Sequence, residues 1–176
     1  IDPRIEFTKR FLSDVDLTPC CNVPLISFPI VHKKIYELWP GPRLVAYPKN
    51  PIFQKLKNQW PKAELFSSGS VIHPAVDLAV QMGAHKVVLL GADFSYPGSR
   101  SHVAGSAEER HIEMEAIRDW VYDGNGERVA TRPNMRGYLR DLESYITLNK
   151  QVSFVNASKI GAYIEGTKFL EPSDGF

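Results

Sequence analysis

Short apolar runs alternate with longer amphipathic runs along most of the chain. This alternation is typical of βα units arranged around a mainly parallel sheet. The pattern predicts strands at residues 23–28, 43–47, 64–66, 86–90 and 152–155. It predicts helices at residues 32–38, 51–59, 71–82, 108–117 and 133–149. The fold class that follows is α/β, Rossmann-like, with helices flanking a mainly parallel sheet.

The clearest unit runs from residue 64 to residue 90. A tight turn, Ser67-Ser68-Gly69-Ser70, joins a short strand to a helix, and Gly83 suits the C-terminal cap of that helix. The strand at 86–90 is apolar on both faces, as central parallel strands are. Helical spacing predicts that one stripe faces the sheet. That stripe consists of Val71, Ala75, Leu78, Ala79 and Met82.

A small insertion and a long loop interrupt the βα pattern. The segment Asp123-Gly124-Asn125-Gly126 lies between two β-rich runs, 120–122 and 128–131, and predicts a β-hairpin. Residues 91–107 carry no clear periodicity, and a loop of that length is usually functional. We therefore expect ligand contacts near the start of this loop.

The length, net charge and cysteine content of the chain limit the classes of protein to which it can belong. The 176 residues fit one domain over 1–176, and a net charge of +1 argues against nucleic-acid or anionic-membrane partners. No apolar run is long enough to span a bilayer. The adjacent Cys20 and Cys21 form no disulfide framework, which indicates a reducing, cytoplasmic location. Because the chain starts at Ile1 rather than Met, we expect a fragment of a larger protein whose N-terminal βα part is absent.

The serine turn is the first candidate binding site. Amides at a helix N-terminus are unpaired and carry partial positive charge, so a phosphate beside Ser67, Ser68, Gly69 and Ser70 would meet backbone donors and hydroxyls. The turn lacks the lysine of a P-loop and the spacing of a dinucleotide fingerprint. The same residues also suit an ordinary serine cap with a glycine turn.

The second candidate site follows the strand at 86–90. Open α/β sheets bind ligands beyond the carboxyl ends of their strands, where Gly91, Asp93 and Tyr96 lie. A carboxylate there can hold a ribose hydroxyl, a metal or a catalytic proton, although Asp93 also suits a turn cap. Asn156 follows the last strand and is expected to share this crevice, to bond a base or sugar, or to cap a turn.

His102, in the long loop, is the candidate acid or base because histidine titrates near neutral pH. His73 is a further candidate, since the first turn of the serine-led helix can face the same site. No group of residues has the spacing of a zinc site, and we expect metal-independent chemistry.

Taken together, these motifs resemble those of the motility-associated-factor glycosyltransferases, which share a domain with 6-hydroxymethylpterin diphosphokinase-like proteins. The resemblance rests on Ser-Gly-Ser-Val (68–71), Gln-Met-Gly (81–83), Val-Val-Leu-Leu-Gly-Ala-Asp-Phe-Ser-Tyr (87–96), His102, Phe-Val-Asn-Ala-Ser (154–158), Gly-Ala (161–162) and Ile-Glu-Gly-Thr (164–167). The chain is more distantly similar to bacterial sialyltransferases. One departure is that the glycine-rich turn expected before Asp2 is missing.

The resemblance implies transfer from a nucleotide-activated sugar, such as a CMP-linked nonulosonic acid, to Ser or Thr of a flagellin-like protein acceptor. It implies that Ser68, Gly69 and Ser70 contact the nucleotide and that Asp93 and Tyr96 line the donor site. His102 would be the acid or base.

Two alternatives remain open at this point. The first is ATP- and Mg²⁺-dependent diphosphorylation of 6-hydroxymethylpterin, for which Asp2 and Asp93 would supply carboxylates. The second is a non-catalytic nucleotide-binding or interaction domain.

Overall fold

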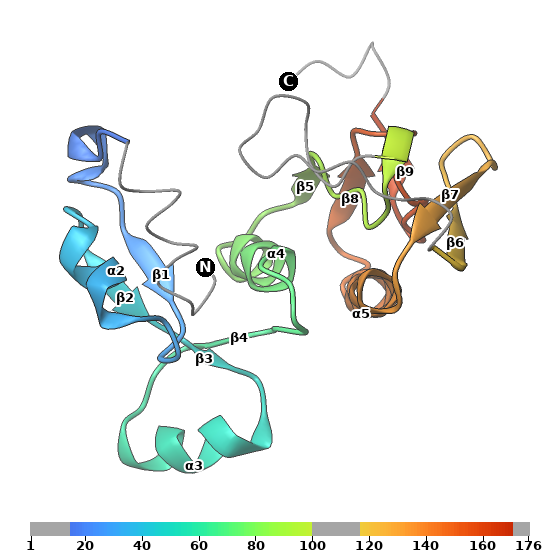
Figure 1. Ribbon diagram of the computed structural model, residues 1–176. Coiled ribbons are helices and arrows are strands. Elements are labelled where there is room, and N and C mark those ends of the chain that lie inside the picture. Colours follow the sequence, from blue (N-terminus) through green and yellow to red (C-terminus); the bar gives the residue numbers. More distant parts are fainter. Residues whose placement is uncertain (1–14, 100–116, 171–176) are drawn as a thin grey trace. The chain divides into compact units, whose positions relative to one another are not determined.

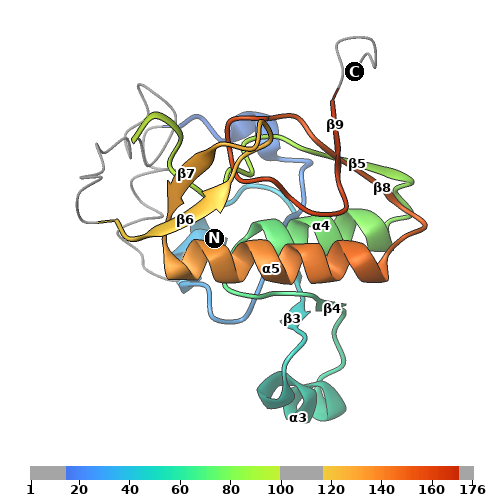
Figure 2. The ribbon, with the colours of Figure 1, turned by 90° about the vertical axis from the view of Figure 1, so that its right-hand side faces the viewer.

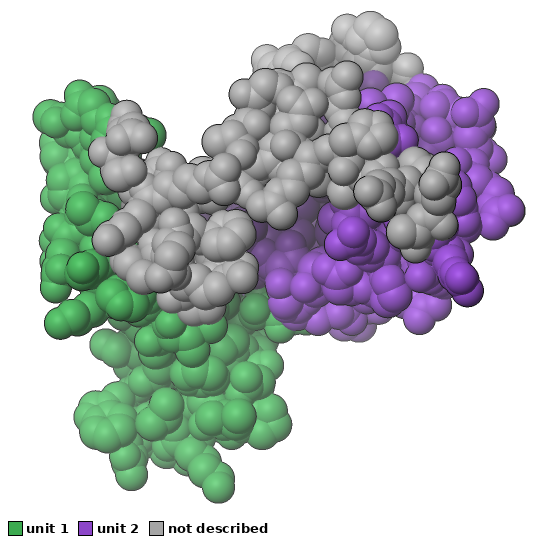
Figure 3. Space-filling view, viewed as in Figure 1, with its two compact units in different colours: residues 1–67 green, residues 68–176 purple. Residues whose placement is uncertain are grey.

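The computed structural model describes residues 15–99 and 117–170 (Figure 1). The chain divides into two compact units, Ile1–Ser67 and Ser68–Phe176 (Figure 3), and each is described by itself. The sequence prediction of one domain over 1–176 stays a prediction. His102 and nearly all of the predicted helix at 108–117 lie outside the described residues.

The first unit holds two small parallel sheets. Strand β1 (Leu25–Ser27) pairs with β2 (Arg43–Val45), and β3 (Tyr47–Pro48) pairs with β4 (Glu64–Leu65). The helical elements are the 3₁₀ helix η1 (Thr18–Cys20), α2 (Lys33–Leu38) and α3 (Pro51–Gln59). The Asn50 side chain caps α3 by accepting from the amides of Ile52 and Phe53.

The second unit is built on three parallel strands in the order β5–β8–β9. Its elements are α4 (Ile72–Gln81), β5 (Lys86–Leu89), the 3₁₀ turn η2 (Pro97–Ser99), β6 (Asp119–Tyr122), β7 (Arg128–Thr131), α5 (Pro133–Leu148), β8 (Ser153–Asn156) and β9 (Lys168–Phe169). Strands β6 and β7 form the predicted antiparallel hairpin. The α/β class with mainly parallel strands flanked by helices is confirmed.

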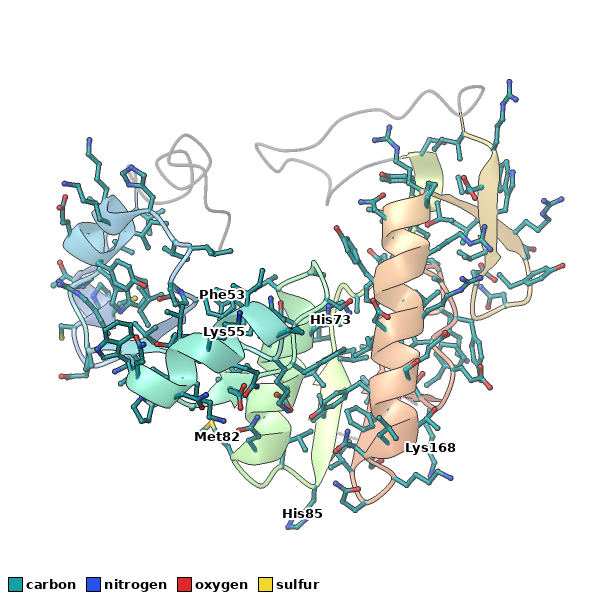
Figure 4. The ribbon with its side chains drawn as sticks, turned by 90° about the horizontal axis from the view of Figure 1, so that it is seen from below. Phe53, Lys55, His73, Met82, His85 and Lys168 are labelled. Carbon is teal, nitrogen blue, oxygen red and sulfur yellow. The ribbon has the colours of Figure 1, made fainter. Side chains whose placement is uncertain are left out.

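Helices α4 and α5 lie side by side, with β5 and β8 on one side of them (Figure 2). Polar side chains join the two helices. The buried Asp77 accepts a hydrogen bond of 2.7 Å from the Tyr145 hydroxyl, and His73 Nε2 donates to the Tyr138 carbonyl at 2.9 Å. Figure 4 shows His73 on the side of α4 that faces α5 and Met82 on another side. The interface between α4 and α5 is therefore polar at its centre.

Two structural predictions are wrong. The buried face of α4 consists of His73, Val76 and Asp77, whereas Val71 and Met82 of the predicted stripe are 67% and 78% exposed. The reason is that α5 supplies hydrogen-bond partners that make burial of the polar side chains favourable. The strand at 86–90 is also not central: among the described residues β8 lies in the middle and β5 at the edge of its sheet.

Candidate functional site

The carboxyl ends of β5 and β8 deliver two polar side chains to one place. The strands are parallel and Leu89 is paired with Asn156, so the segments that follow them leave the sheet together. Asp93 lies in the first of these segments and Ser158 in the second, and hydrogen bonding from Ser158 is among the causes that act on the pKa of the Asp93 carboxyl. The segment after β8 meets Asp93 at Gly161 and Ala162, and a ligand site shared by the two strand ends stays a prediction.

The backbone around Asp93 is held by the segment after β8. The Ala162 amide donates to the Asp93 carbonyl at 2.7 Å and also lies 3.1 Å from the Ser95 hydroxyl oxygen. That hydroxyl donates to the same Asp93 carbonyl at 2.9 Å. Gly161 passes so close that a Cβ placed on it would lie 2.7 Å from both the Cα and the Oδ1 of Asp93. Asp93 therefore occupies a fixed position against Gly161 and Ala162.

The residue after Asp93 has a strained backbone. Phe94 has a φ of +46°, in the left-handed region that side chains other than glycine rarely adopt. The Thr131 hydroxyl of β7 donates to the Phe94 carbonyl at 2.7 Å, and the Tyr96 amide donates to the Ala130 carbonyl at 2.8 Å. Such strain costs on the order of 1–3 kcal/mol and is concentrated at functional sites. The conformation of this loop thus supports a functional role for Asp93.

Burial raises the pKa of the Asp93 carboxyl above its ordinary value, and the hydrogen bond from Ser158 opposes part of that effect. Desolvation disfavours the charged form, whereas a donor to the carboxylate favours it. A carboxylate with a raised pKa is a stronger proton acceptor once it is ionised. This is the property that a general base requires.

The hairpin and the segment after β8 border a hollow beside this cluster. The Gly124 amide at the hairpin tip donates to the Lys159 carbonyl at 2.9 Å, which fixes the two segments to each other. The hollow has a volume of about 440 Å³, within the range of small-ligand sites. It is lined by Pro97, Gly98, Asp123, Glu127, Arg128, Val129 and Ile160.

The serine turn has a different environment from Asp93. The Ser68 hydroxyl donates to the Asp141 carboxylate of α5, and Gly69 lies directly against the Tyr138 ring, where an added Cβ would be 2.5 Å from Cε1. The close approach that Gly69 permits is therefore to Tyr138. No side chain caps α4 at Val71, so the amides of its first turn are without a side-chain cap. A phosphate contact at residues 68–70 stays a prediction.

The other predicted contact residues have contrasting exposure. Gly91 is exposed, with a φ of +67° and open space around it. Tyr96 is buried, and the Arg132 guanidinium lies 5.6 Å from its ring centre. Asn156 is 1% exposed, and its Oδ1 accepts a hydrogen bond of 3.1 Å from the Ser158 amide. In this conformation the Asn156 side chain holds the turn that carries Ser158. Ser67 belongs to the first unit, and its binding role stays a prediction.

Sequence reasoning did not identify the α5 residues that meet the serine turn. Tyr138 and Asp141 lie on a helix whose amphipathic pattern predicts only which face is buried. No spacing in the sequence pairs them with residues about 70 positions earlier. Within residues 15–99 and 117–170, no three His, Cys, Asp or Glu side chains lie close enough together to hold a metal ion.

Gly161→Ala is expected to displace Asp93 and to lower any activity that depends on it. The added methyl group would overlap Asp93 Cα and Oδ1, so the loop must shift, and a misplacement of about 1 Å can cost roughly 100-fold in rate. Turnover and thermal unfolding of the variant measure the effect. Gly137→Ala is the matched control: its Cβ meets nothing within 4 Å, and alanine in a helix is worth about 0.5–1 kcal/mol over glycine. Equal activities of the two variants would refute this account.

The fold and the strand-end cluster define a parallel α/β protein with its candidate site at the carboxyl edge of the sheet. The model of the 6-hydroxymethylpterin diphosphokinase MptE-like family matches residues 1–99, and the chain belongs to this family. No curated protein matches the chain.

One solved structure shares the fold. It is the MAf glycosyltransferase from Magnetospirillum magneticum AMB-1, which is 17% identical, with a TM-score of 0.64 over 87% of this chain. The present chain covers 23% of the length of that protein. The likeness supports the Rossmann-like assignment. Among the described residues, no helix combines the length and the apolar character that a membrane span requires.

Proposed function

We propose that the chain is a glycosyltransferase domain. The donor is a nucleotide-activated sugar of the CMP-nonulosonic acid type, and the acceptor is a protein hydroxyl such as Ser or Thr of a flagellin-like protein. The observation that carries the proposal is the Asp93 carboxylate, fixed beyond β5 next to a strained residue, with a pKa raised by burial. The shared fold with the MAf glycosyltransferase and the sequence motifs around Asp93 support it.

In this mechanism the acceptor oxygen attacks the anomeric carbon of the sugar. The bond between that carbon and the phosphate oxygen breaks, and the nucleotide leaves with the electron pair. Asp93 takes the proton of the acceptor hydroxyl, with His102 as the second candidate for this role. The first-turn amides of α4 and the Ser70 hydroxyl stabilise the departing phosphate, because fixed dipoles need no reorganisation during the reaction.

Calorimetric titration with CMP, CDP, UDP and ATP, each with and without Mg²⁺, tests the donor class. We expect CMP to bind without Mg²⁺. Ser70→Ala should weaken that binding roughly 10- to 150-fold, the effect of losing one hydrogen bond to a charged group. Ser144→Ala is the matched control, since this exposed hydroxyl of α5 donates only to the Arg140 carbonyl among the described contacts. Failure of all four nucleotides to bind would exclude the proposal.

A second candidate function is favoured by the family to which the chain belongs. In pyrophosphoryl transfer from ATP to 6-hydroxymethylpterin, Mg²⁺ would neutralise the phosphates, and carboxylates would hold the ion. Asp93 would be one such ligand and Asp2, outside the described residues, another. Heat released by ATP only in the presence of Mg²⁺, with no response to CMP, would select this function over glycosyl transfer.

A further inference from the structure

We infer that Asp141 of α5 is a positioning residue, which turns the Ser68 hydroxyl so that it accepts a hydrogen bond from a ribose hydroxyl of the nucleotide. This inference rests on the proposed function and deepens it. The phosphate remains with Ser70 and the first-turn amides of α4, and Ser68 takes no part in holding it. The group that Ser68 recognises is a neutral hydrogen-bond donor.

The serine turn is fixed by one face of α5. Tyr138 and Asp141 are three positions apart on this helix and therefore lie on the same face. The Ser68 hydroxyl donates to Asp141 Oδ2, and Gly69, with a φ of +83°, lies against the Tyr138 ring. His73, on the side of α4 that faces α5 (Figure 4), donates through Nε2 to the Tyr138 carbonyl at 2.9 Å. Helix α5 therefore holds both the turn and the helix that follows it.

The hydrogen bond to Asp141 limits what the Ser68 hydroxyl can do for a ligand. A serine hydroxyl has one hydrogen to donate and two lone pairs that accept, whereas a carboxylate only accepts. Ser68 gives its hydrogen to Asp141, so its Oγ faces a ligand as an acceptor. The free oxygens of the phosphodiester in a CMP-linked sugar are acceptors too and gain no bond there. A ribose hydroxyl can donate to this oxygen.

The charge of Asp141 leads to the same assignment. Within residues 15–99 and 117–170, no lysine or arginine forms an ion pair with this carboxylate. A phosphate beside Ser68 would therefore meet a like charge, which is unfavourable. Ser70 lies two residues further on, next to the α4 amides, whose partial positive charge favours a phosphate. Because the ribose is joined directly to the phosphate, one nucleotide can reach both serines.

The test is a set of calorimetric titrations of the full chain with CMP, 2′-deoxy-CMP and 3′-deoxy-CMP. We expect the wild type to bind one of the two deoxy analogues roughly 2- to 10-fold more weakly than CMP, the effect of losing one hydrogen bond. Ser68→Ala should bind that analogue and CMP equally, and Ser68→Thr, which keeps the hydroxyl, should restore the preference. Ser70→Ala should weaken all three ligands by the same factor and leave the preference intact.

Variants of Asp141 separate positioning from a merely structural role. Asp141→Asn keeps an oxygen that accepts from the Ser68 hydroxyl and should keep the preference for ribose. Asp141→Leu has no acceptor, so the Ser68 hydroxyl is free to rotate and the preference should be lost. If Asp141→Leu does not fold, Asp141→Ala gives the same comparison. A general loosening of the turn would weaken the three ligands alike and would not change the ratio of their Kd values.

The outcomes distinguish this inference from the proposed function. Equal Kd values for CMP and both analogues in the wild type, or a preference that survives in Ser68→Ala, overturn the role of Ser68 and leave the CMP site in place. A preference that is lost in Ser68→Ala but kept in Asp141→Leu overturns the role of Asp141. If ATP with Mg²⁺ binds and CMP does not, glycosyl transfer is refuted. A ribose preference for ATP over its deoxy analogues that is lost in Ser68→Ala and in Asp141→Leu would then support the pair.

Discussion

Asp93→Asn is expected to lower sugar transfer by roughly 100- to 10,000-fold, the contribution typical of a general base. The asparagine cannot take the acceptor proton. Donor binding should change less than turnover, since the nucleotide contacts are proposed at residues 68–70. Steady-state kinetics with the donor identified by titration measure both effects.

The same variant should be as stable as the wild type or more stable. Burial raises the pKa of Asp93 in the folded state above its unfolded value, so the folded state binds the proton more tightly. The free energy of unfolding therefore falls as pH rises through the window between the two pKa values, and the cost remains at neutral pH. Replacing the carboxylate by a neutral amide removes that cost. Thermal unfolding at pH 7 measures it.

Asp16→Asn is the control, because the pKa of Asp16 is shifted in the direction opposite to that of Asp93. This exposed carboxylate has a pKa lowered by hydrogen bonds from the side chain and the backbone amide of Thr18. Its stabilising effect is present above its unfolded pKa and is lost as pH falls through its folded pKa. At pH 7 its removal should slightly lower the melting temperature and leave turnover intact. An Asp93→Asn variant that keeps its turnover and melts earlier would contradict the role assigned to Asp93.

Local patterns in the sequence predict the elements of this fold well. Helix α3 begins after Asn50 as expected, because an asparagine cap and a following proline act over adjacent residues. The hairpin around Gly124 is confirmed for the same reason. Strand β9 was missed, since two residues in a glycine-punctuated tail carry no periodicity, and only its pairing with β8 makes it a strand.

Contacts between distant residues account for what the sequence could not predict. The buried face of α4 carries His73 and Asp77, whose partners on α5 lie 65 and 68 positions later. Apolar periodicity therefore indicated the wrong stripe. The candidate site likewise has one part that the sequence predicts and another that only the structure reveals. Because ligands bind beyond the carboxyl ends of parallel strands, the sequence predicts that Asp93 and the segment after β8 lie close together. Only the structure reveals that Gly69 lies against Tyr138.

Tyr145→Phe is expected to destabilise the second unit by about 2 kcal/mol, because it removes a buried hydrogen bond to a carboxyl group. The Tyr145 hydroxyl donates to Asp77 Oδ1 at 2.7 Å, and Gln81 Nε2 donates to Oδ2 at 2.8 Å. Asp77 is only 3% exposed, so water cannot readily replace the lost donor. Burial, with the hydrogen bond to Asp77, also raises the pKa of the Tyr145 phenol, so the hydroxyl remains a donor throughout the neutral range. A loss of this size lowers the melting temperature by roughly 4–8 °C in a chain of this length.

A double-variant cycle shows whether this loss comes from the unpaired carboxyl group or from packing. Replacing both partners, Asp77→Leu with Tyr145→Phe, should recover much of the stability lost in Tyr145→Phe alone, since a buried pair exchanged for apolar groups can be nearly neutral. Tyr122→Phe is the control, because this tyrosine is 64% exposed and its change should stay within about 0.5 kcal/mol. If the double variant is less stable than Tyr145→Phe, the two helices depend on the polar pair itself for their alignment. Equal melting temperatures for Tyr145→Phe and wild type would mean that the Asp77–Tyr145 hydrogen bond does not stabilise the interface between α4 and α5.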